Sequence, residues 1–340
     1  MMRIAINGFG RIGRNFFRAL SEDKFASGAI ELVAINVGPA KIENVAHAVK
    51  YDTLMGIYPG DVHMDNDSLV INGKHIKILT ECDPAKLPWK ELDIDWAVEC
   101  SGRFTKREGA KKHLEAGAGH VLISAPACDE DVSIVPGVND NAFNKDKDKI
   151  VSLGSCTTNA IVPMLKVLHD AFVIERGFMT TVHAYTNNQV LLDVDGSDLR
   201  RSRAAAINII PTTTGAMKMV GKIIPDLIGR VEAVAIRVPL PKVSLIDLTF
   251  SAKKAMTKDL INNVFEKASQ SGPMKNILTI TMEPLVSSDF NGDPHSVIID
   301  GKLTDTNGEN MGKVFGWYDN EWAYSVRLKD FLLGVLGVSN

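Results

Sequence analysis

The 340-residue sequence predicts an α/β protein with two domains: a parallel-sheet domain, then an α+β domain with a mostly antiparallel sheet. Over residues 1–154, short β-rich runs alternate with helix-like segments, as parallel β-α-β units require. Over residues 155–323, the β-branched runs are longer and less often separated by helices, which is typical of antiparallel sheets. Because no linker-like stretch separates these two sequence patterns, we place the domain boundary beside Cys156.

The first domain is expected to open with a strand at Arg3–Asn7, a helix at Arg11–Ser21, a strand at Ile30–Asn36 and a helix at Asn44–Lys50. Further strands are expected at Leu69–Ile71, His75–Leu79, Trp96–Cys100, Val121–Ser124 and Ile150–Ser152. The Asn72-Gly73 pair is a turn signal between two of them.

The second domain should contain five longer strands and three helical segments on one face of the sheet. The strands are expected at Glu175–His183, Val231–Val238, Ser244–Ala252, Ile277–Met282 and Ser296–Asp300, and the helices at Ala204–Ile207, Gly215–Ile224 and Thr257–Ser269. The amphipathic run Tyr324–Leu336 predicts a terminal helix, within residues 324–340, that packs back onto the first domain.

Composition favours small-molecule chemistry in the cytoplasm. The formal net charge of −3 provides no strong field for nucleic acid or for an anionic membrane, and no apolar run approaches the roughly 18 residues of a membrane span. The four cysteines form no Cys-x-x-Cys pair, so we expect neither a metal site nor a disulfide-stapled secreted scaffold.

A Gly-x-Gly-x-x-Gly motif at Gly8, Gly10 and Gly13 follows the first expected strand and opens the first expected helix. In this context the first glycine permits a tight turn, the second lets a pyrophosphate approach the backbone, and the third allows close helix packing. The alternative is a glycine turn without a ligand. The placement favours a Rossmann-type dinucleotide-binding domain.

The second strand lacks the acidic residue that usually selects NAD in such domains. Asn36-Val37-Gly38 stands at that point, about 20 positions beyond the glycines. Without a carboxylate, a 2′-phosphate is no longer repelled. The sequence therefore predicts NAD with NADP also admissible, and leaves the preference open.

Cys156 stands between hydroxyl side chains, after a glycine and before an apolar, helix-like run. A helix amino terminus carries partial positive charge and unpaired N–H groups, and both stabilise a thiolate and an oxyanion beside it. Read without further context, Cys156 is equally well a buried structural cysteine.

Six separated blocks of the sequence resemble the phosphorylating glyceraldehyde-3-phosphate dehydrogenase family, and the resemblance extends over essentially the whole chain. The blocks are Ile6–Arg14, Ser155–Asn159, Thr181–Thr186, Pro211–Ala216, Arg237–Pro239 and Trp317–Trp322. The resemblance implies that D-glyceraldehyde 3-phosphate is oxidised to 1,3-bisphosphoglycerate through a cysteine thioester, with hydride transfer to NAD or NADP, in glycolysis or gluconeogenesis.

The resemblance also implies a role for each matching residue. Cys156 is the nucleophile, and His183 is the imidazolium that lowers its pKa and the base for the hemithioacetal hydroxyl. By itself, a histidine in a β-rich run is more often a satisfied core or surface residue. The implied dinucleotide contacts are Asn7, Gly8, Gly10, Arg11, Ile12, Gly13, Asn36, Val37, Ser101, Ser124 and Asn320.

Two phosphate sites follow from the same resemblance. Thr186 and Arg237 are matched to the phosphate of the substrate, whereas Ser155, Thr157, Thr214 and Gly215 are matched to inorganic phosphate. Hydroxyls, N–H groups and a guanidinium suit anions. Without the family, Arg237 reads equally well as a solvent-facing strand residue. We expect the cluster Arg200-Arg201-x-Arg203 to form loop or intersubunit ion pairs, with Arg201 as a weaker phosphate candidate.

The chain departs from the family pattern at three positions. Ala160 replaces the usual second cysteine, so a local disulfide with Cys156 cannot form. Asn188 stands where many bacterial relatives carry aspartate. We hypothesise that Asp195, in a loop that lines a neighbouring subunit's cofactor site, replaces the carboxylate missing at Val37. The alternative for Asp195 is an exposed turn aspartate, and a kinetic preference for NADP would eliminate the hypothesis.

A loop that completes a neighbouring site implies a homo-oligomer, and the family's usual form is a homotetramer. Three alternatives for the activity remain: an erythrose-4-phosphate dehydrogenase, a non-catalytic binding protein on the same fold, and a semialdehyde dehydrogenase. The retained Thr186 and Thr213-Thr214-Gly215 favour the triose substrate, and intact Cys156, His183 and Arg237 favour catalysis.

Overall fold

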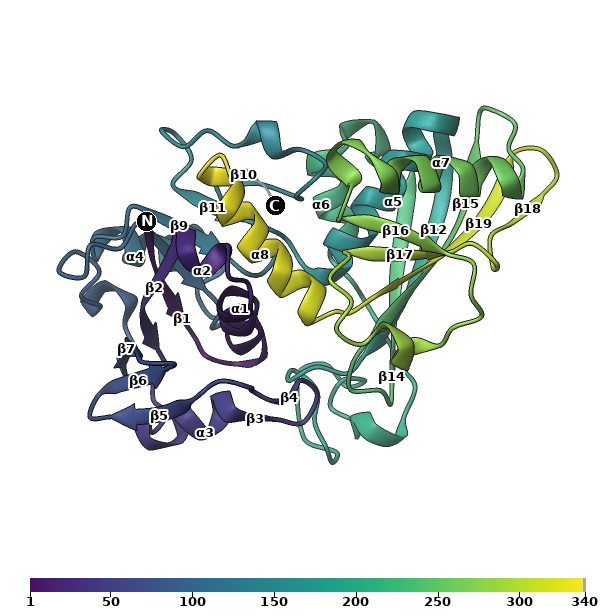
Figure 1. The fold of residues 1–340 in the computed structure, drawn as a ribbon. Coiled ribbons are helices and arrows are strands. Elements are labelled where there is room, and N and C mark those ends of the chain that lie inside the picture. Colours follow the sequence, from purple (N-terminus) through teal and green to yellow (C-terminus); the bar gives the residue numbers. More distant parts are fainter. Residues whose placement is uncertain (339–340) are drawn as a thin grey trace. The chain divides into compact units, whose positions relative to one another are not determined.

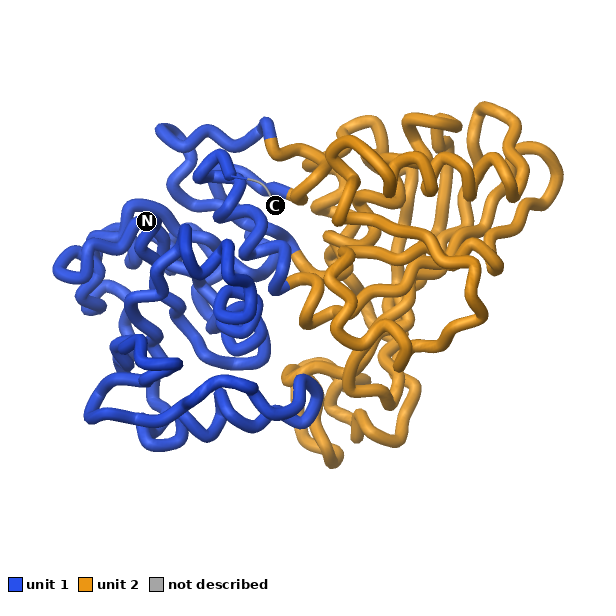
Figure 2. Tube along the Cα trace, in the orientation of Figure 1, with its two compact units in different colours: residues 1–134, 141–154, 325–340 blue, residues 135–140, 155–324 orange. Residues whose placement is uncertain are grey.

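The protein is described by a computed structural model over residues 1–338, and the chain divides into two compact units (Figure 2). Unit 1 contains Met1–Ile134, Asn141–Gly154 and the chain from Ser325 onward. Unit 2 contains Val135–Asp140 and Ser155–Tyr324. The chain thus passes from unit 1 to unit 2 directly before Cys156.

Unit 1 is built on a nine-stranded sheet with the spatial order β10-β11-β9-β8-β1-β2-β7-β6-β5 (Figure 1). The strands from β10 to β7 are parallel, while β6 and β5 are antiparallel to their neighbours. The strands are β1 Met2–Asn7, β2 Ile30–Asn36, β5 Val62–Asp65, β6 Ser68–Ile71, β7 Lys74–Leu79, β8 Trp96–Glu99, β9 His120–Ile123, β10 Val132–Ser133 and β11 Ile150–Ser152.

The expected parallel organisation therefore holds for the central strands and ends at a hairpin. Asn72 and Gly73 have φ values of 49° and 80°, which form the tight turn that joins β6 to β7 in antiparallel order. The strand β5 was not expected, because it is short and presents a half-buried, half-exposed pattern. A separate two-stranded ribbon consists of β3 Tyr51–Asp52 and β4 Gly56–Ile57.

The helices of unit 1 bury apolar stripes against this sheet. They are α1 Arg11–Glu22, α2 Ala26–Ala29, α3 Val45–Lys50 and α4 Arg107–Glu115. On α1, Phe16, Phe17 and Leu20 are buried, at the spacing of one helix face. The last helix, α8 Trp322–Val335, contributes the residues from Ser325 onward to unit 1.

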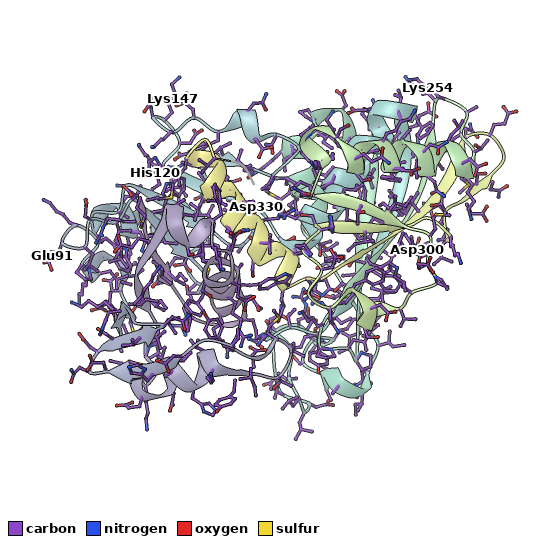
Figure 3. The ribbon with its side chains drawn as sticks, in the orientation of Figure 1. Glu91, His120, Lys147, Lys254, Asp300 and Asp330 are labelled. Atoms are coloured by element: carbon purple, nitrogen blue, oxygen red, sulfur yellow. The ribbon has the colours of Figure 1, made fainter. Side chains whose placement is uncertain are left out.

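Contacts within unit 1 hold this last helix in place. Phe331 packs edge to face on Trp96 with ring centroids 5.6 Å apart, and Lys329 forms an ion pair with Asp23. Asp330, labelled in Figure 3, pairs with Arg327 at 2.6 Å. Residues 339–340, the end of the expected helical segment, lie outside the described residues.

Unit 2 contains an eight-stranded, mostly antiparallel sheet with the order β13-β14-β12-β15-β19-β17-β16, and β18 pairs with β19. Two neighbouring pairs, β12 with β14 and β16 with β17, are parallel. The strands are β12 Ile174–Ala184, β13 Ile210–Thr212, β14 Val231–Val238, β15 Ser244–Ala252, β16 Leu278–Thr281, β17 Val297–Asp300, β18 Asp305–Asn307 and β19 Met311–Tyr318. The mixed α/β class predicted from sequence is confirmed.

Three helices cover one face of this sheet: α5 Cys156–Phe172, α6 Ala216–Ile223 and α7 Lys258–Gln270 (Figure 1). Their buried side chains, such as Leu165, Val220 and Phe265, form a single core with Phe250 and Val314 of the sheet. The expected helix at Ala204–Ile207 is only a short 3-10 turn over Ala205–Ile207 in which Ile207 is exposed, so it does not cover the sheet.

Candidate active site

Cys156 is the first residue of α5 and therefore lies among the N–H groups that have no partner within the helix. The Ser155 side chain caps the helix by accepting a hydrogen bond from the Thr158 N–H at 3.1 Å. Gly154, just before the cap, has a φ of 64°, a left-handed conformation that glycine adopts without strain. The first turn has no acidic residue. The sequence thus places the thiol at a helix end that favours negative charge.

His183, on β12, lies beside this thiol, and its Nε2 is 3.5 Å from the Cys156 Sγ. The strand register sets His183 directly opposite Arg237 of the neighbouring parallel strand β14. The Arg237 Nη1 is 2.9 Å from the His183 Nδ1 and donates to the Ala184 carbonyl at 2.9 Å. Sheet pairing therefore brings a thiol, an imidazole and a guanidinium together within unit 2.

The buried surroundings of this cluster bear on the charge state expected from sequence. Burial and the charge of Arg237 lower the pKa of His183 to about 3, so its imidazole is neutral at physiological pH. Burial raises the pKa of the Cys156 thiol, against the lowering effect of Arg237. These surroundings oppose the expected imidazolium, which stays a prediction. Arg237 supplies a positive charge beside the imidazole, and that charge disfavours a second cation there.

The neutral imidazole is oriented as a base. Its Nδ1 lies 2.7 Å from the Ala184 carbonyl oxygen, which can only accept a hydrogen bond. Nδ1 also lies 2.9 Å from the Arg237 Nη1, which can only donate, so its two neighbours require opposite roles. The shorter contact, to the carbonyl, would place the ring proton on Nδ1 and leave the lone pair of Nε2 facing the thiol. The pair is thus a thiol and an acceptor, ready for proton transfer when the sulfur attacks.

Tyr318 fixes the position of this pair and was not predicted as a site residue. Its hydroxyl is hydrogen-bonded to Thr157 at 3.0 Å and to Thr181 at 2.8 Å, and its ring packs edge to face on His183. Burial raises the pKa of Tyr318, so the hydroxyl stays protonated. Because the Thr157 hydroxyl is engaged here, an anion at this position would meet the Thr157 backbone N–H. The block Trp317–Trp322 was the only signal in the sequence for Tyr318.

Arg237 has the features of an anion-binding residue. Its Nε is buried without a hydrogen-bond partner, and its Nη1 lies 3.5 Å from the hydroxyl of Thr186. The Thr186 hydroxyl donates to the Asn188 Oδ1 at 2.7 Å, so the neutral Asn188 supports it without adding a negative charge. An unpaired buried guanidinium N–H is costly unless a ligand accepts its hydrogen bond.

The other residues predicted for phosphate lie at helix amino termini. The Ser155 hydroxyl serves as the cap of α5, while Gly215 is the cap residue of α6. The Thr214 hydroxyl accepts from the Ala216 N–H at 3.3 Å, and a side chain at position 215 would meet no atom within 4 Å. Thr214 is half-buried and Gly215 is exposed, and within the described residues neither has a hydrogen bond to Cys156, His183 or Arg237.

Asn320 is linked to the backbone beside His183 through a second hydroxyl that was not predicted. The Ser244 Oγ accepts from the Ala184 N–H at 3.1 Å and donates to the Asn320 Oδ1 at 3.1 Å. Asn320 is buried in unit 2. Its carboxamide is therefore oriented, with the oxygen toward Ser244 and the amide nitrogen free to face elsewhere.

The glycine motif of unit 1 has the geometry that a dinucleotide requires. Gly8 has a φ of 95°, and a Cβ there would lie 2.4 Å from the backbone of Ser101. A Cβ on Gly13 would lie 2.3 Å from the Gly8 carbonyl oxygen, whereas one on Gly10 would meet nothing within 4 Å. The amino terminus of α1 has no side-chain cap and no acidic residue in its first turn. The residues present therefore fit a pyrophosphate beside Gly10.

The remaining predicted cofactor residues lie around this motif and at neighbouring strand ends. Arg11 forms an ion pair with Asp52; burial alone would raise the Asp52 pKa, but the hydrogen bonds from Arg11 and two backbone N–H groups lower it to about 2. Ile12 is half-buried on the first turn of α1. Val37 donates its N–H to Leu79 at 2.8 Å, and Ser124 donates to the Glu99 carbonyl at 2.9 Å.

The loop of residues 185–209 carries the arginines that were expected to form ion pairs. Arg201 pairs with Asp198 at 2.8 Å and Arg203 with Asp193 at 2.6 Å. Asp195 is exposed on unit 2, and its suggested role at the cofactor site of another subunit stays a prediction.

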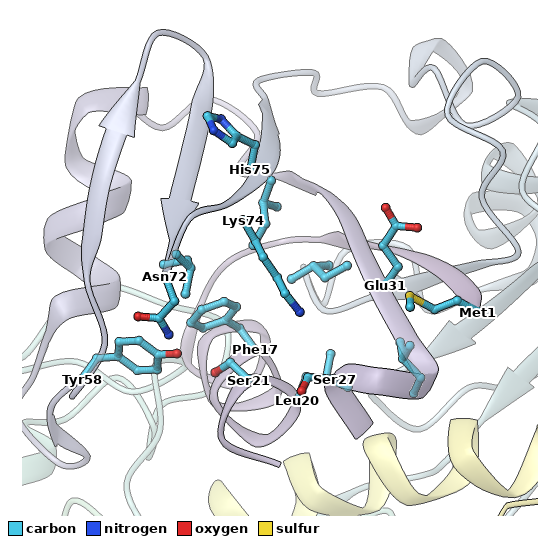
Figure 4. Close-up of a pocket in the computed structure, with 14 residues that line it drawn as sticks. Met1, Phe17, Leu20, Ser21, Ser27, Glu31, Tyr58, Asn72, Lys74 and His75 are labelled. Carbon is cyan, nitrogen blue, oxygen red and sulfur yellow. The ribbon is translucent and has the colours of Figure 1, made fainter. Parts of the chain in front are cut away.

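Unit 1 also contains a separate cavity of about 680 Å³ (Figure 4). It is lined by Phe17 and Leu20 of α1 and by the first residues of β2 and β7, Ile30 and Lys74. The glycine motif follows the carboxyl end of β1, which is parallel to both strands. The cavity is therefore distinct from the dinucleotide site. Within residues 1–338, no group of side chains has the composition of a metal site, and no helix is long and apolar enough to cross a membrane.

A glycine-motif sheet domain joined to a domain with a buried thiol, imidazole and guanidinium defines a class: nicotinamide-dependent dehydrogenases that work through a cysteine. Residues 2–107 match the family described as "Glyceraldehyde 3-phosphate dehydrogenase, NAD binding domain", and residues 155–320 match "Glyceraldehyde 3-phosphate dehydrogenase, C-terminal domain". The chain belongs to the glyceraldehyde-3-phosphate dehydrogenase family.

Curated relatives agree over nearly full length. The chain is 48% identical to "Glyceraldehyde-3-phosphate dehydrogenase" of Streptomyces coelicolor over 98% of both chains. It is 46% identical to "Glyceraldehyde-3-phosphate dehydrogenase 2" of Bacillus subtilis over 97% of this chain and 96% of the relative. The Geobacillus stearothermophilus "Glyceraldehyde-3-phosphate dehydrogenase" is 48% identical over 97% and 96%. The protein is thus an oxidoreductase that binds NAD or NADP and acts on an aldehyde with phosphate.

Proposed function

We propose that the protein converts D-glyceraldehyde 3-phosphate and inorganic phosphate to 1,3-bisphosphoglycerate through a thioester on Cys156. The observation that carries this proposal is the 3.5 Å separation between the Cys156 Sγ and the Nε2 of His183, beside a buried guanidinium with an unpaired Nε. Relatives that carry the name of this activity support the same conclusion.

The first step forms a carbon–sulfur bond. As the Cys156 Sγ attacks the aldehyde carbon, its proton passes to the His183 Nε2 and then to the former carbonyl oxygen, which gives a hemithioacetal. Charge that develops on this oxygen is stabilised by the imidazole N–H and by the amino terminus of α5.

The second and third steps oxidise and release the acyl group. A bound nicotinamide would supply the acceptor for the hydride that leaves the hemithioacetal carbon. The His183 Nε2 takes the hydroxyl proton, and a thioester remains on Cys156. An oxygen of inorganic phosphate then attacks the thioester carbon, and the carbon–sulfur bond breaks to release the acyl phosphate. The Cys156 thiolate takes back the proton that His183 holds, which restores the thiol and the free imidazole. Asn320, oriented by Ser244, would bind the carboxamide of the nicotinamide.

In this proposal the two phosphate groups bind at different places: one at Arg237 and Thr186, and the other at helix amino termini. Arg237 and Thr186 bind the phosphate that the substrate carries, and Asn188 orients the Thr186 hydroxyl. Inorganic phosphate binds backbone N–H groups at Ser155, Thr157 and Gly215, together with the hydroxyls of Ser155 and Thr214. The free Nε of Arg237 and the open backbone at Gly215 support this assignment.

Replacement of Arg237 with glutamine is expected to raise the KM for glyceraldehyde 3-phosphate by about a hundredfold, because one charged, hydrogen-bonded contact with the phosphate is lost. Unphosphorylated glyceraldehyde is the matched control substrate, and its kcat/KM should change far less. A loss of equal size with both substrates would show that Arg237 acts on the cysteine and histidine rather than on the phosphate.

The reaction itself is tested by its need for phosphate. Purified protein should reduce NAD or NADP with glyceraldehyde 3-phosphate when phosphate or arsenate is present, and should stop after one turnover per site without either. Continued turnover without both anions would indicate a hydrolytic enzyme. A higher kcat/KM for erythrose 4-phosphate would favour that alternative substrate.

We further propose that the protein is a homotetramer. The loop of residues 185–209 exposes large apolar side chains, among them Leu191 at 80%, Leu199 at 81% and Ile207 at 80%. Such a patch is costly on a monomer and typical of an interface. Sedimentation should give four times the chain mass of 37.0 kDa, and Leu191→Asp should shift the protein to smaller species. A monomer at micromolar concentration would contradict the proposal.

We place the protein in the cytoplasm. All four of its cysteines are free, including the exposed Cys82 and Cys128, which suits a reducing compartment. The reaction also needs Cys156 to remain reduced, because an oxidised sulfur cannot attack the aldehyde.

A further inference from the structure

A buried network of hydrogen bonds spans three neighbouring strands of unit 1 at their carboxyl ends. The register pairs Asn7 of β1 with Asn36 of β2 on one side and with Glu99 of β8 on the other. The Asn36 Nδ2 donates to the Asn7 Oδ1 at 2.6 Å, and the Asn7 Nδ2 donates to the Glu99 Oε2. All three side chains are at most 3% exposed, so their polar atoms depend on each other.

The network continues into α4 and fixes the proton of a buried histidine. Trp89 Nε1, which can only donate, lies 3.0 Å from the His113 Nδ1, so this nitrogen must accept. The ring proton is therefore on Nε2, which donates to the Glu99 Oε2 at 3.1 Å. His113 is thus a donor toward Glu99, and Trp89 determines which nitrogen donates.

Glu99 accepts hydrogen bonds on both of its oxygens. Its Oε1 accepts from the Ser101 N–H at 2.7 Å and from the Ser101 hydroxyl, while its Oε2 accepts from Asn7 and His113. Every one of these four partners is a donor. Four donors thus satisfy both oxygens of this buried side chain.

The residues that Glu99 holds are those that form the dinucleotide crevice. Asn7 directly precedes Gly8, and the Gly8 Cα packs against the Ser101 backbone that Glu99 fixes. On the other side, the Asn36 Oδ1 accepts from the Glu81 N–H at 2.9 Å and from the Gly38 N–H at 3.4 Å, next to Val37. One network of hydrogen bonds therefore links the glycine motif to the end of β2, where Val37 lies.

We propose that Glu99 and His113 are positioning residues for the dinucleotide: His113, with its proton fixed on Nε2 by Trp89, orients the Glu99 carboxylate, which holds Asn7 and Ser101 in the geometry that binds the cofactor. The inference rests on the dinucleotide site described above. Neither Trp89 nor His113 needs to touch the ligand. Loss of the His113 donor leaves the buried carboxylate one hydrogen bond short, and the strand ends rearrange to supply another.

Two substitutions at position 113 separate the two functions of the ring. Glutamine can place an amide N–H where Nε2 stands, so His113→Gln keeps the donor to Glu99. Asparagine reaches only the Nδ1 position, so His113→Asn keeps an acceptor for Trp89 and loses the donor. Calorimetric titration of the protein with NAD, in the absence of aldehyde, should give a Kd about tenfold higher for His113→Asn and for Glu99→Gln, and within about threefold of the parent for His113→Gln.

The control and the kinetics distinguish positioning from general destabilisation. Glu115→Gln, an exposed change on the same helix, should leave the Kd unchanged. In His113→Asn, the KM for NAD should rise while kcat at saturating NAD stays near the parent value, because Cys156 and His183 belong to unit 2. A parent protein that does not bind NAD would contradict the proposed function instead.

Two results would overturn the inference. The first is a parent-like Kd in folded His113→Asn and Glu99→Gln, or equal weakening in His113→Gln and His113→Asn. The second result comes from neutron diffraction of the deuterated parent and needs no variant. The inference predicts a deuteron on the His113 Nε2 and none on Nδ1. A deuteron on Nδ1 would refute the network even if every variant failed to fold.

Discussion

Replacement of Cys156 with serine is expected to lower kcat by at least about a thousandfold while NAD still binds. A hydroxyl at this position ionises far less readily than a thiol, and an oxygen ester is a poorer acyl donor to phosphate than a thioester. The measurement is the steady-state rate of NAD reduction with saturating glyceraldehyde 3-phosphate and phosphate, together with a calorimetric Kd for NAD.

An exposed cysteine provides the matched control for this substitution. Cys128 lies at the surface of unit 1, so Cys128→Ser should retain the parent rate. Turnover by Cys156→Ser within tenfold of the parent would show that the sulfur is not the nucleophile. Loss of NAD binding in the same variant would point to misfolding and would require a second nucleophile substitution, such as Cys156→Ala.

Replacement of His183 with asparagine is expected to lower kcat by about 10²- to 10⁴-fold, because the variant has no base to accept the thiol and hemithioacetal protons. The pH dependence should change as well. With a pKa lowered to about 3, His183 in the parent is already the free base throughout the range from pH 5 to 8. The parent rate should therefore show no acid limb from this residue in that range.

In the asparagine variant, proton removal must come from hydroxide or buffer, so the rate of Cys156 alkylation should rise steeply with pH. In Arg237→Gln, loss of the neighbouring positive charge should raise the pKa of His183. The pH at which the reaction rate falls on the acid side should therefore be higher than in the parent. If the parent instead shows an acid limb between pH 5 and 7 that disappears in His183→Asn, the imidazole is protonated at neutral pH and the neutral pair is wrong.

Strands and motifs with strong local patterns could be predicted from the sequence. The glycine motif requires three special backbone environments in a row, and the structure has all of them at Gly8, Gly10 and Gly13. By contrast, β19 was not predicted. Gly312 and Gly316 weaken its β pattern, yet they are packing requirements: a Cβ on Gly316 would lie 2.6 Å from Val297, and one on Gly312 would lie 2.9 Å from Phe250.

The parts of the site that sequence reasoning missed depend on which strands are neighbours. The pairing of His183 with Arg237 follows from the register of β12 with β14, and burial together with this pairing lowers the pKa of His183. Likewise, Tyr318 reaches Thr157 and Thr181 only because β19 and β12 flank β15. No spacing along the chain encodes such contacts.

The central claim is that Cys156 is covalently acylated during the reaction. The most direct measurement is mass spectrometry of enzyme that has been incubated with glyceraldehyde 3-phosphate and NAD without phosphate, and then quenched in acid. The peptide that contains Cys156 should carry one acyl group from the substrate, and addition of phosphate before the quench should remove it. An unmodified Cys156 peptide, or an adduct confined to Cys82, Cys100 or Cys128, would contradict the account.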